Sequence, residues 1–206
     1  MTLDFWFDFA STYSYLSAMR IDALAAEQGV SVRWRPFLLG PIFQAQGWNT
    51  SPFNVYPAKG AYMVRDIDRI AEARGIGFQM PKPFPQNSLL AARVALAIAD
   101  EASRAVFCRA VFEMEFAKGR SIDDPFALGG CLSEVGLNAS TMLQASRTDE
   151  VKLRLREETE LAQRLSIFGA PTFATKDDEL FWGDDRLERA LGWEVGGSAS
   201  KLPPKA

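Results

Sequence analysis

The chain has 206 residues, of which 48% are hydrophobic and 24% charged, values that are ordinary for a soluble globular protein. Its formal net charge of -3 argues against nucleic acid as a partner, and no apolar run approaches the roughly 20 residues of a membrane span. Histidine is absent, and the two cysteines, Cys108 and Cys131, are far apart. We therefore expect no disulfide framework, no bound metal and no histidine-based triad. Asp4 and Asp8 interrupt the N-terminal stretch, which does not resemble a secretory signal, so a cytoplasmic location is expected.

Residues 3–29 predict a strand, a sharp turn and one helix. Apolar side chains alternate from Leu3 to Phe9, which is typical of a strand with one strongly apolar face. Ser11 and the hydroxyl residues after it favour a helix start, and Gly29 favours a helix end. A helix N-terminus at the carboxyl end of a strand is a suitable place for an anion. The rest of the chain is expected to build a pocket around that point.

Residues 30–39 predict a second strand, parallel to the first because a helix connects them. Residues 42–61 contain several Gly, Pro and polar residues, and we expect a long functional loop there. A helix is predicted from about Tyr62 to Gly75, followed by an extended proline-rich segment at 80–86.

Residues 87–165 predict five helices and no strand, which indicates a helical subdomain inserted into another fold. The expected helix starts are Asn87 or Ser88, Ser103, the run Asp123-Asp124-Pro125, Asn138 or Ser140, and Thr148 or Asp149.

The C-terminal part predicts an antiparallel hairpin, with strands at 171–174 and 179–182. A short helix follows, capped by Asp184 and Asp185 and closed by Gly192, and residues 196–206 have the composition of a flexible tail. The order β-α-β, helical insertion, α-β-β-α is that of a thioredoxin-like α/β fold. We expect a discontinuous thioredoxin-like domain at 1–42 and 166–195, with a helical insertion at 43–165.

Several motifs together resemble the 2-hydroxychromene-2-carboxylate isomerase family, which is related to kappa-class glutathione transferases and DsbA-type oxidoreductases. They are FDFASTYSYL, SPFNVYPAKGAYMVRDIDRIA, FPQNS, FGAPTF and FWGDDRLE, and the resemblance extends from about residue 2 to 193. It implies a DsbA/kappa-type thioredoxin fold with an all-helical insertion, a homodimer, and glutathione as cofactor. It also implies the reversible isomerisation of 2-hydroxychromene-2-carboxylate to trans-o-hydroxybenzylidenepyruvate, a step of naphthalene degradation. Thr12 departs from the proline that is common in the family at this position.

Ser11 and Ser14 occupy the positions of the C-x-x-C cysteines of redox relatives, so dithiol exchange is impossible here. By itself, Ser11 predicts only a helix N-cap. The resemblance implies that Ser11 is the catalytic residue and donates a hydrogen bond to the glutathione sulfur. Lowering a thiol pKa from about 8.5 to 7 requires roughly 2 kcal/mol. A helix end supplies about 0.3–1 kcal/mol and a hydrogen bond to a charged group about 1.5–3 kcal/mol.

The resemblance implies further glutathione contacts. The backbone at Ala170 and Pro171 would pair with the cysteinyl part, and Pro171 would be cis in this fold. Asp184 and Asp185 would hold the γ-glutamyl end. The alternatives are an ordinary strand start and plain helix caps. The loop over the ligand would contribute Lys59 and Asn54, or Asn49, although these polar residues are also typical of a solvated loop.

Four aromatic residues could line a pocket for a small aromatic carboxylic acid, although aromatic residues in such a pattern more often belong to the core: Trp48, Tyr56, Tyr62 and Phe84. Cys108 and Cys131 are expected to be buried and inert. Two alternative functions stay open from the sequence. One is a kappa-like glutathione transferase or peroxidase, and the other is a non-catalytic DsbA-like binding protein.

Overall fold

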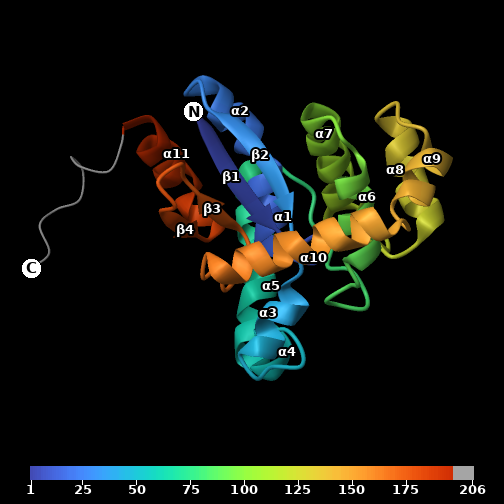
Figure 1. Ribbon diagram of the computed structural model, residues 1–206. Coiled ribbons are helices and arrows are strands. Elements are labelled where there is room, and N and C mark those ends of the chain that lie inside the picture. The colour runs from blue at the N-terminus through green and yellow to red at the C-terminus, as the bar shows by residue number, and fades with distance from the viewer. Residues whose placement is uncertain (197–206) are drawn as a thin grey trace, which may run out of the picture.

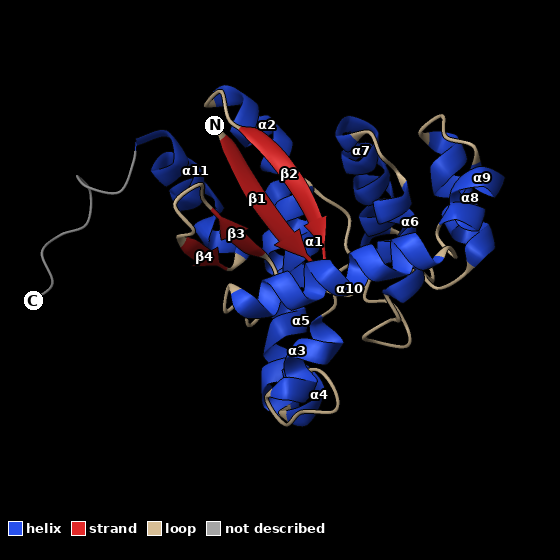
Figure 2. Cartoon of the chain, in the orientation of Figure 1, coloured by secondary structure: helices blue, strands red, loops and turns tan. Residues whose placement is uncertain are grey.

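The computed structural model describes residues 1–196, which fold around one four-stranded sheet (Figure 1). The strand order is β2-β1-β3-β4, with β1 and β2 parallel and the pairs β1–β3 and β3–β4 antiparallel. The strand bounds are β1 Thr2–Phe7, β2 Ser31–Pro36, β3 Thr172–Ala174 and β4 Leu180–Trp182. The predicted parallel unit and C-terminal hairpin are both confirmed. Figure 2 shows how much of the molecule around this small sheet is helical.

Strand β1 is buried on both faces, so the expectation of one apolar face is incomplete. Phe5 and Phe7 belong to the large core, where Phe5 stacks on Phe173 of β3 with ring centres 5.6 Å apart. Trp6 points to the opposite face, is fully buried, and contacts Phe37 in a second, smaller core. A central strand covered on both faces can bury apolar residues at successive positions.

The predicted single helix after β1 is wrong, because the structure has two helices, α1 (Thr12–Ala18) and α2 (Ile21–Glu27). The break lies at Arg20, whose φ of -135° is not helical. The Arg20 guanidinium donates to the backbone oxygen of Asp184 at 2.7 Å. The break thus coincides with a contact to a residue far away in the sequence.

The prediction of a long loop at residues 42–61 is also wrong. The structure has α3 (Leu39–Ala45), α4 (Pro52–Val55) and α5 (Pro57–Arg74). Pro52 and Pro57 each lie in the first turn of a helix, where proline loses no hydrogen bond. Ser51 caps α4 by accepting from the N–H of Phe53. Prolines that we interpreted as loop residues therefore start helices.

The five predicted helices of the central region are present. Their bounds are α6 Leu89–Ala97, α7 Glu101–Phe112, α8 Pro125–Glu134, α9 Ala139–Ala145 and α10 Asp149–Arg164, and a π-helical turn at Glu113–Ala117 continues α7. The cap of α7 is Asp100 and not Ser103, since Asp100 accepts from the Ser103 N–H at 2.8 Å. Helix α10 leads from α9 back toward the sheet (Figure 1). One continuous core joins these helices to β1, so they pack on the sheet.

The last helix is longer than predicted. A 3-10 turn at Asp184–Arg186 leads into α11 (Leu187–Gly196), which continues through Gly192. The Glu194 carboxylate, fully buried, accepts from the Lys176 N–H at 2.9 Å and holds the end of this helix. The predicted flexible tail beyond Gly196 lies outside the described residues. Within residues 1–196, none of the helices combines the length and apolar character that a membrane crossing requires.

Candidate functional site

Ser11 lies between β1 and α1 and faces the loop that precedes β3. Its hydroxyl accepts from the Ser14 N–H at 3.2 Å, which confirms the predicted N-cap. The same hydroxyl donates to the carbonyl of Ala170 at 3.0 Å. The Ala170–Pro171 peptide bond is cis, as the fold implied. The structure therefore brings together three sequence-predicted residues from opposite ends of the chain.

A cavity of about 1220 Å³ opens beside Ser11. Its wall comes from the start of α1, from α3, α4 and α5, from residues 84–89, and from the loops at 168–171 and 182–186. Most ligand pockets measure about 300–1,000 Å³, so this space exceeds the needs of one small ligand.

Lys59 and Asn49 line this cavity, whereas Asn54 does not. The Asn54 amide donates instead to the Thr50 hydroxyl at 3.1 Å on an exposed turn. Lys59 lies in α5, and its ammonium is 5.9 Å from the centre of the Phe53 ring. No carboxylate of residues 1–196 lies within ion-pair distance of Lys59. Asn49 thus replaces Asn54 as the candidate amide of this wall.

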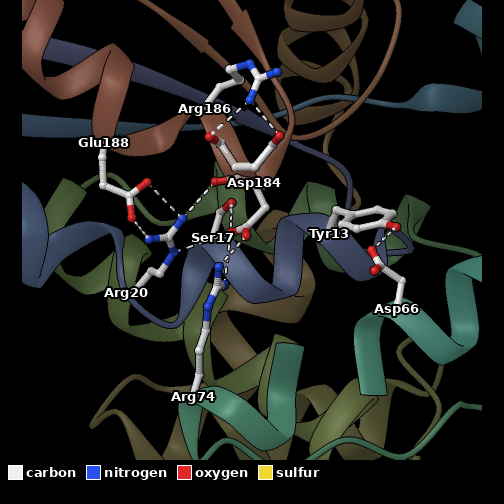
Figure 3. A network of polar contacts seen from close by, with 9 residues as sticks. Tyr13, Ser17, Arg20, Asp66, Arg74, Asp184, Arg186 and Glu188 are labelled. Carbon is white, nitrogen blue, oxygen red and sulfur yellow. Dashed lines mark hydrogen bonds and ion pairs between the residues drawn. The ribbon is translucent and has the colours of Figure 1, made fainter. Parts of the chain in front are cut away.

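Asp184 is 3% exposed, and its carboxylate is already engaged by other residues of the chain (Figure 3). Arg74 forms a bidentate ion pair with it, in which Nη2 is 2.7 Å from Oδ2 and Nη1 is 3.2 Å from Oδ1. The Ser17 hydroxyl donates to the same carboxylate at 2.9 Å, and Arg20 lies at 3.4 Å while also pairing with Glu188. The carboxylate of Asp184 thus joins α1, α5 and the loop before α11, and the predicted helix cap by this side chain is not formed.

Asp185 has a different environment, although it is the next residue. Its side chain is 73% exposed and lines the cavity, and among residues 1–196 it forms an ion pair only with the adjacent Arg186. Gly183 precedes the pair with φ of 108°, and a Cβ there would lie 2.7 Å from a carboxylate oxygen of Asp185. The absence of a side chain at Gly183 therefore leaves room for the Asp185 carboxylate.

Three of the four predicted aromatic residues, Trp48, Tyr62 and Phe84, line the cavity, and Tyr56 does not. Phe168 and Trp182 are among the aromatic wall residues that the sequence did not indicate; their ring centres are 4.8 Å apart and both are about half exposed. The Trp182 indole lies against Gly169, where a Cβ would be 2.5 Å from the indole nitrogen. The glycine of the FGAPTF motif was the only sequence signal of this close approach.

The sequence also did not indicate several polar residues of the cavity wall, among them Tyr13 and Asp8. Tyr13, on the first turn of α1, donates to the Asp66 carboxylate of α5 at 2.9 Å (Figure 3). Burial raises the pKa of Tyr13, and the hydrogen bond and charge of Asp66 raise it further, so the phenol stays protonated. Asp8 is the second; it is 4% exposed and follows β1 directly.

The two cysteines are buried and free, as expected. Burial raises the pKa of both thiols, that of Cys131 to about 11, which keeps them protonated and unreactive at neutral pH. Residues 1–196 contain no group of three or more acidic or cysteine side chains suited to a metal ion.

Comparison with known proteins agrees with this architecture. Residues 2–192 match the model of the DsbA-like thioredoxin domain. The chain is 31% identical to a 2-hydroxychromene-2-carboxylate isomerase from Sphingobium xenophagum, over 91% of this chain and 94% of that protein. The chain belongs to the 2-hydroxychromene-2-carboxylate isomerase family of DsbA-like proteins.

A solved structure of a 2-hydroxychromene-2-carboxylate isomerase superposes with a TM-score of 0.83, at 29% identity, over 93% of this chain and 95% of that one. Human glutathione S-transferase kappa 1 is 27% identical over 91% of this chain and 88% of its own length. The family and the thioredoxin-like fold that the motifs implied are thus confirmed.

Proposed function

We propose that this protein is a glutathione-dependent cis–trans isomerase. Its substrate would be 2-hydroxychromene-2-carboxylate, in exchange with trans-o-hydroxybenzylidenepyruvate, or a similar aromatic enone acid. Relatives that are named isomerases support an enzyme of this type. The observation that carries the proposal is the 3.0 Å hydrogen bond from Ser11 to the carbonyl before cis-Pro171, at the wall of a large cavity.

The donors and acceptors around Ser11 fit glutathione. The backbone of Ala170 offers polar groups to the cysteinyl part, and the exposed carboxylate of Asp185 offers an acceptor for the γ-glutamyl ammonium. Lys59, or Lys59 with Asn49, would hold a carboxylate at the other end of the cavity. When bound, glutathione would supply a thiolate that adds reversibly to the enone, so that the former double bond can rotate.

Ser11 would stabilise the negative charge of the glutathione thiolate. Its hydroxyl has one proton, which points to Ala170 here and would turn toward the sulfur when the ligand pairs with Ala170. Because α1 has only seven residues, its dipole contributes at the low end of about 0.3–1 kcal/mol. The Ser11 hydrogen bond, worth about 1.5–3 kcal/mol to a charged acceptor, therefore supplies most of the roughly 2 kcal/mol required.

The aromatic part of the wall would hold the substrate ring. Phe168 and Trp182 lie next to the Ala170 loop and are about half exposed. Aromatic rings attract one another beyond the area they bury, by about 0.5–1.5 kcal/mol per pair. A planar aromatic acid is thus the substrate class that this wall fits best.

Isothermal titration calorimetry with reduced glutathione tests the proposal, on the wild type, Ser11→Ala and Ser11→Thr. We expect saturable binding by all three. The thiol pKa of the bound ligand should be lowered in the wild type and in Ser11→Thr, which keeps the hydroxyl, and lowered less in Ser11→Ala. Absence of binding by the wild type at millimolar glutathione would contradict the proposal and favour a non-catalytic DsbA-like binding protein.

A kappa-like glutathione transferase is the second candidate, favoured by the match to human glutathione S-transferase kappa 1. It would use the same Ser11 site, but the glutathione thiolate would form a lasting C–S bond with an electrophile and expel its leaving group, so that glutathione is consumed. Parallel assays with an electrophilic aryl halide and with the chromene acid separate the two. Turnover of the chromene acid without consumption of glutathione supports the isomerase. A homodimer is proposed from the resemblance, and analytical ultracentrifugation tests it.

A further inference from the structure

Asp8 fixes the turn that carries Ser11. Its carboxylate accepts from the N–H of Ala10 at 2.9 Å with one oxygen and from the N–H of Leu39 at 2.8 Å with the other. Its backbone carbonyl accepts from the N–H of Ser11 at 3.0 Å. The two residues that precede α1 are therefore bonded to Asp8, and the turn is joined to the first residue of α3.

The same side chain reaches a third segment of the cavity wall. The Ser88 side chain, at the start of α6, lies close enough to the Asp8 carboxyl to offset part of the rise in its pKa that burial causes. Asp8, Leu39 and Ser88 all line the cavity, and so do Ala10 and Ser11. One buried carboxylate thus sets the relative positions of three segments that are separated by about 30 or more residues in the sequence.

Asp8 has a buried acidic neighbour, Glu115, on the π-helical turn. Both carboxylate oxygens of Glu115 lack a hydrogen-bond partner within residues 1–196. Burial raises the pKa of Glu115 well above its usual range, and the charge of Asp8 adds to this. Glu115 therefore holds its proton more tightly than Asp8 does, and Asp8, whose carboxylate accepts from two backbone N–H groups, is the member of the pair that ionises first.

The stability of the fold does not account for a carboxylate at this position. Burial is the largest cause acting on Asp8, and its pKa is raised despite the hydrogen bonds from Leu39 and Ala10 and the nearby Ser88 side chain. A raised pKa means that ionisation of Asp8 at neutral pH favours the unfolded chain. The benefit of this carboxylate has to lie elsewhere, and its bonds lead to the Ser11 turn.

We propose that Asp8 is a positioning residue for Ser11, whose carboxylate holds the Ser11 hydroxyl where it meets the sulfur of the bound thiol. This inference rests on the proposed function. It predicts that a substitution of Asp8 changes the pKa of the ligand thiol and has little effect on the affinity for the ligand.

The test is the thiol pKa of bound glutathione, followed by the ultraviolet absorbance of the thiolate as pH is varied. Asp8→Asn keeps the shape but turns an amide N–H toward one of the two backbone N–H groups. We expect glutathione to bind within about threefold of the wild type and its thiol pKa to rise by about one unit, which from a pKa near 7 is about a fivefold loss of thiolate at neutral pH. Asp4→Asn is the control, because Asp4 lies on β1, which leads into Asp8, and pairs with Arg33 and Arg35.

An unchanged or lowered thiol pKa in Asp8→Asn would overturn the inference, and a lowered value would mean that the charge of Asp8 only opposes the thiolate. If Asp8→Asn does not fold, Ser88→Ala decides: a smaller rise supports the inference, and no rise overturns it. The proposed function fails separately, through the absence of glutathione binding by the wild type. If the wild type binds glutathione and the thiol pKa of the bound ligand is unchanged in the variants, only the role of Asp8 is overturned.

Discussion

Asp184 and Asp185 are neighbours in the chain, yet one carboxylate is buried among two arginines and a serine while the other is exposed at the cavity. A buried charge that loses its compensation destabilises a fold, whereas an exposed pair contributes little. Substitution of Asp184 should therefore affect mainly stability, and substitution of Asp185 mainly ligand binding.

We expect Asp184→Asn to lower the free energy of unfolding by about 3 kcal/mol, because Arg74 and Arg20 would lose the carboxylate that compensates them. Asp185→Asn should change it by less than about 0.5 kcal/mol and weaken glutathione binding about tenfold. Urea unfolding and calorimetry on both variants check this. Equal loss of stability in the two variants would contradict the distinction.

The amides of the α3–α5 region provide a second matched pair. Asn49 lines the cavity and Asn54 does not, although both are exposed. We expect Asn49→Ala to weaken glutathione binding by about 1 kcal/mol, the typical value of one hydrogen bond, or roughly fivefold. Asn54→Ala should bind as the wild type does. Calorimetry on the two variants makes the comparison, and a reversed order would show that the other amide contacts the ligand.

Trp182 and Tyr56 are both about half exposed, but only Trp182 lies at the cavity wall. We expect Trp182→Leu to raise the KM for an aromatic enone acid about tenfold, because the substrate loses an aromatic contact worth about 1 kcal/mol together with buried area. Glutathione affinity should be unchanged. Tyr56→Leu serves as the control, with little change in KM. Steady-state kinetics with saturating glutathione measures both, and an equal effect would place the substrate ring elsewhere.

Glu115 should make stability depend on pH. Because its pKa is raised from the ordinary 4.5, the folded protein binds the proton more tightly than the unfolded chain. Stability should therefore fall as pH rises from about 4.5 through the raised pKa. Glu115→Gln removes this ionisation, so we expect a similar Tm at pH 4.5 and a Tm about 2–4 °C higher at alkaline pH, or about 1 kcal/mol.

Glu113→Gln is the control for this prediction, since Glu113 lies on the same π-helical turn with an exposed side chain. Its Tm should follow the wild type at both pH values. Thermal unfolding by circular dichroism over a series of buffers gives the comparison. A Glu115→Gln curve parallel to that of the wild type would contradict the assignment of a buried, protonated Glu115.

Much of the fold could be predicted because the deciding interactions are local. The caps Ser11, Asn138 and Thr148 each accept a hydrogen bond from the N–H three residues later, a contact that depends on almost nothing else. The alternating pattern of β1 and the hairpin of β3 and β4 also depend mainly on residues that are close together in the sequence. The N-cap at Ser11 was predicted from the local sequence, and the cis bond before Pro171 from the order of the elements together with the family resemblance.

Only the tertiary structure decided the rest, because the deciding partners are distant in the chain. Arg20 breaks a helical pattern at a contact with Asp184, 164 residues away, and Arg74 meets the same carboxylate across 110 residues. Trp182 reaches the cavity because Gly169 leaves room for its indole. The sequence by itself determined which chemical groups are present and where the local elements begin. Packing determined which carboxylates are compensated in the interior and which remain at the cavity, since charge burial depends on neighbours that no local pattern records.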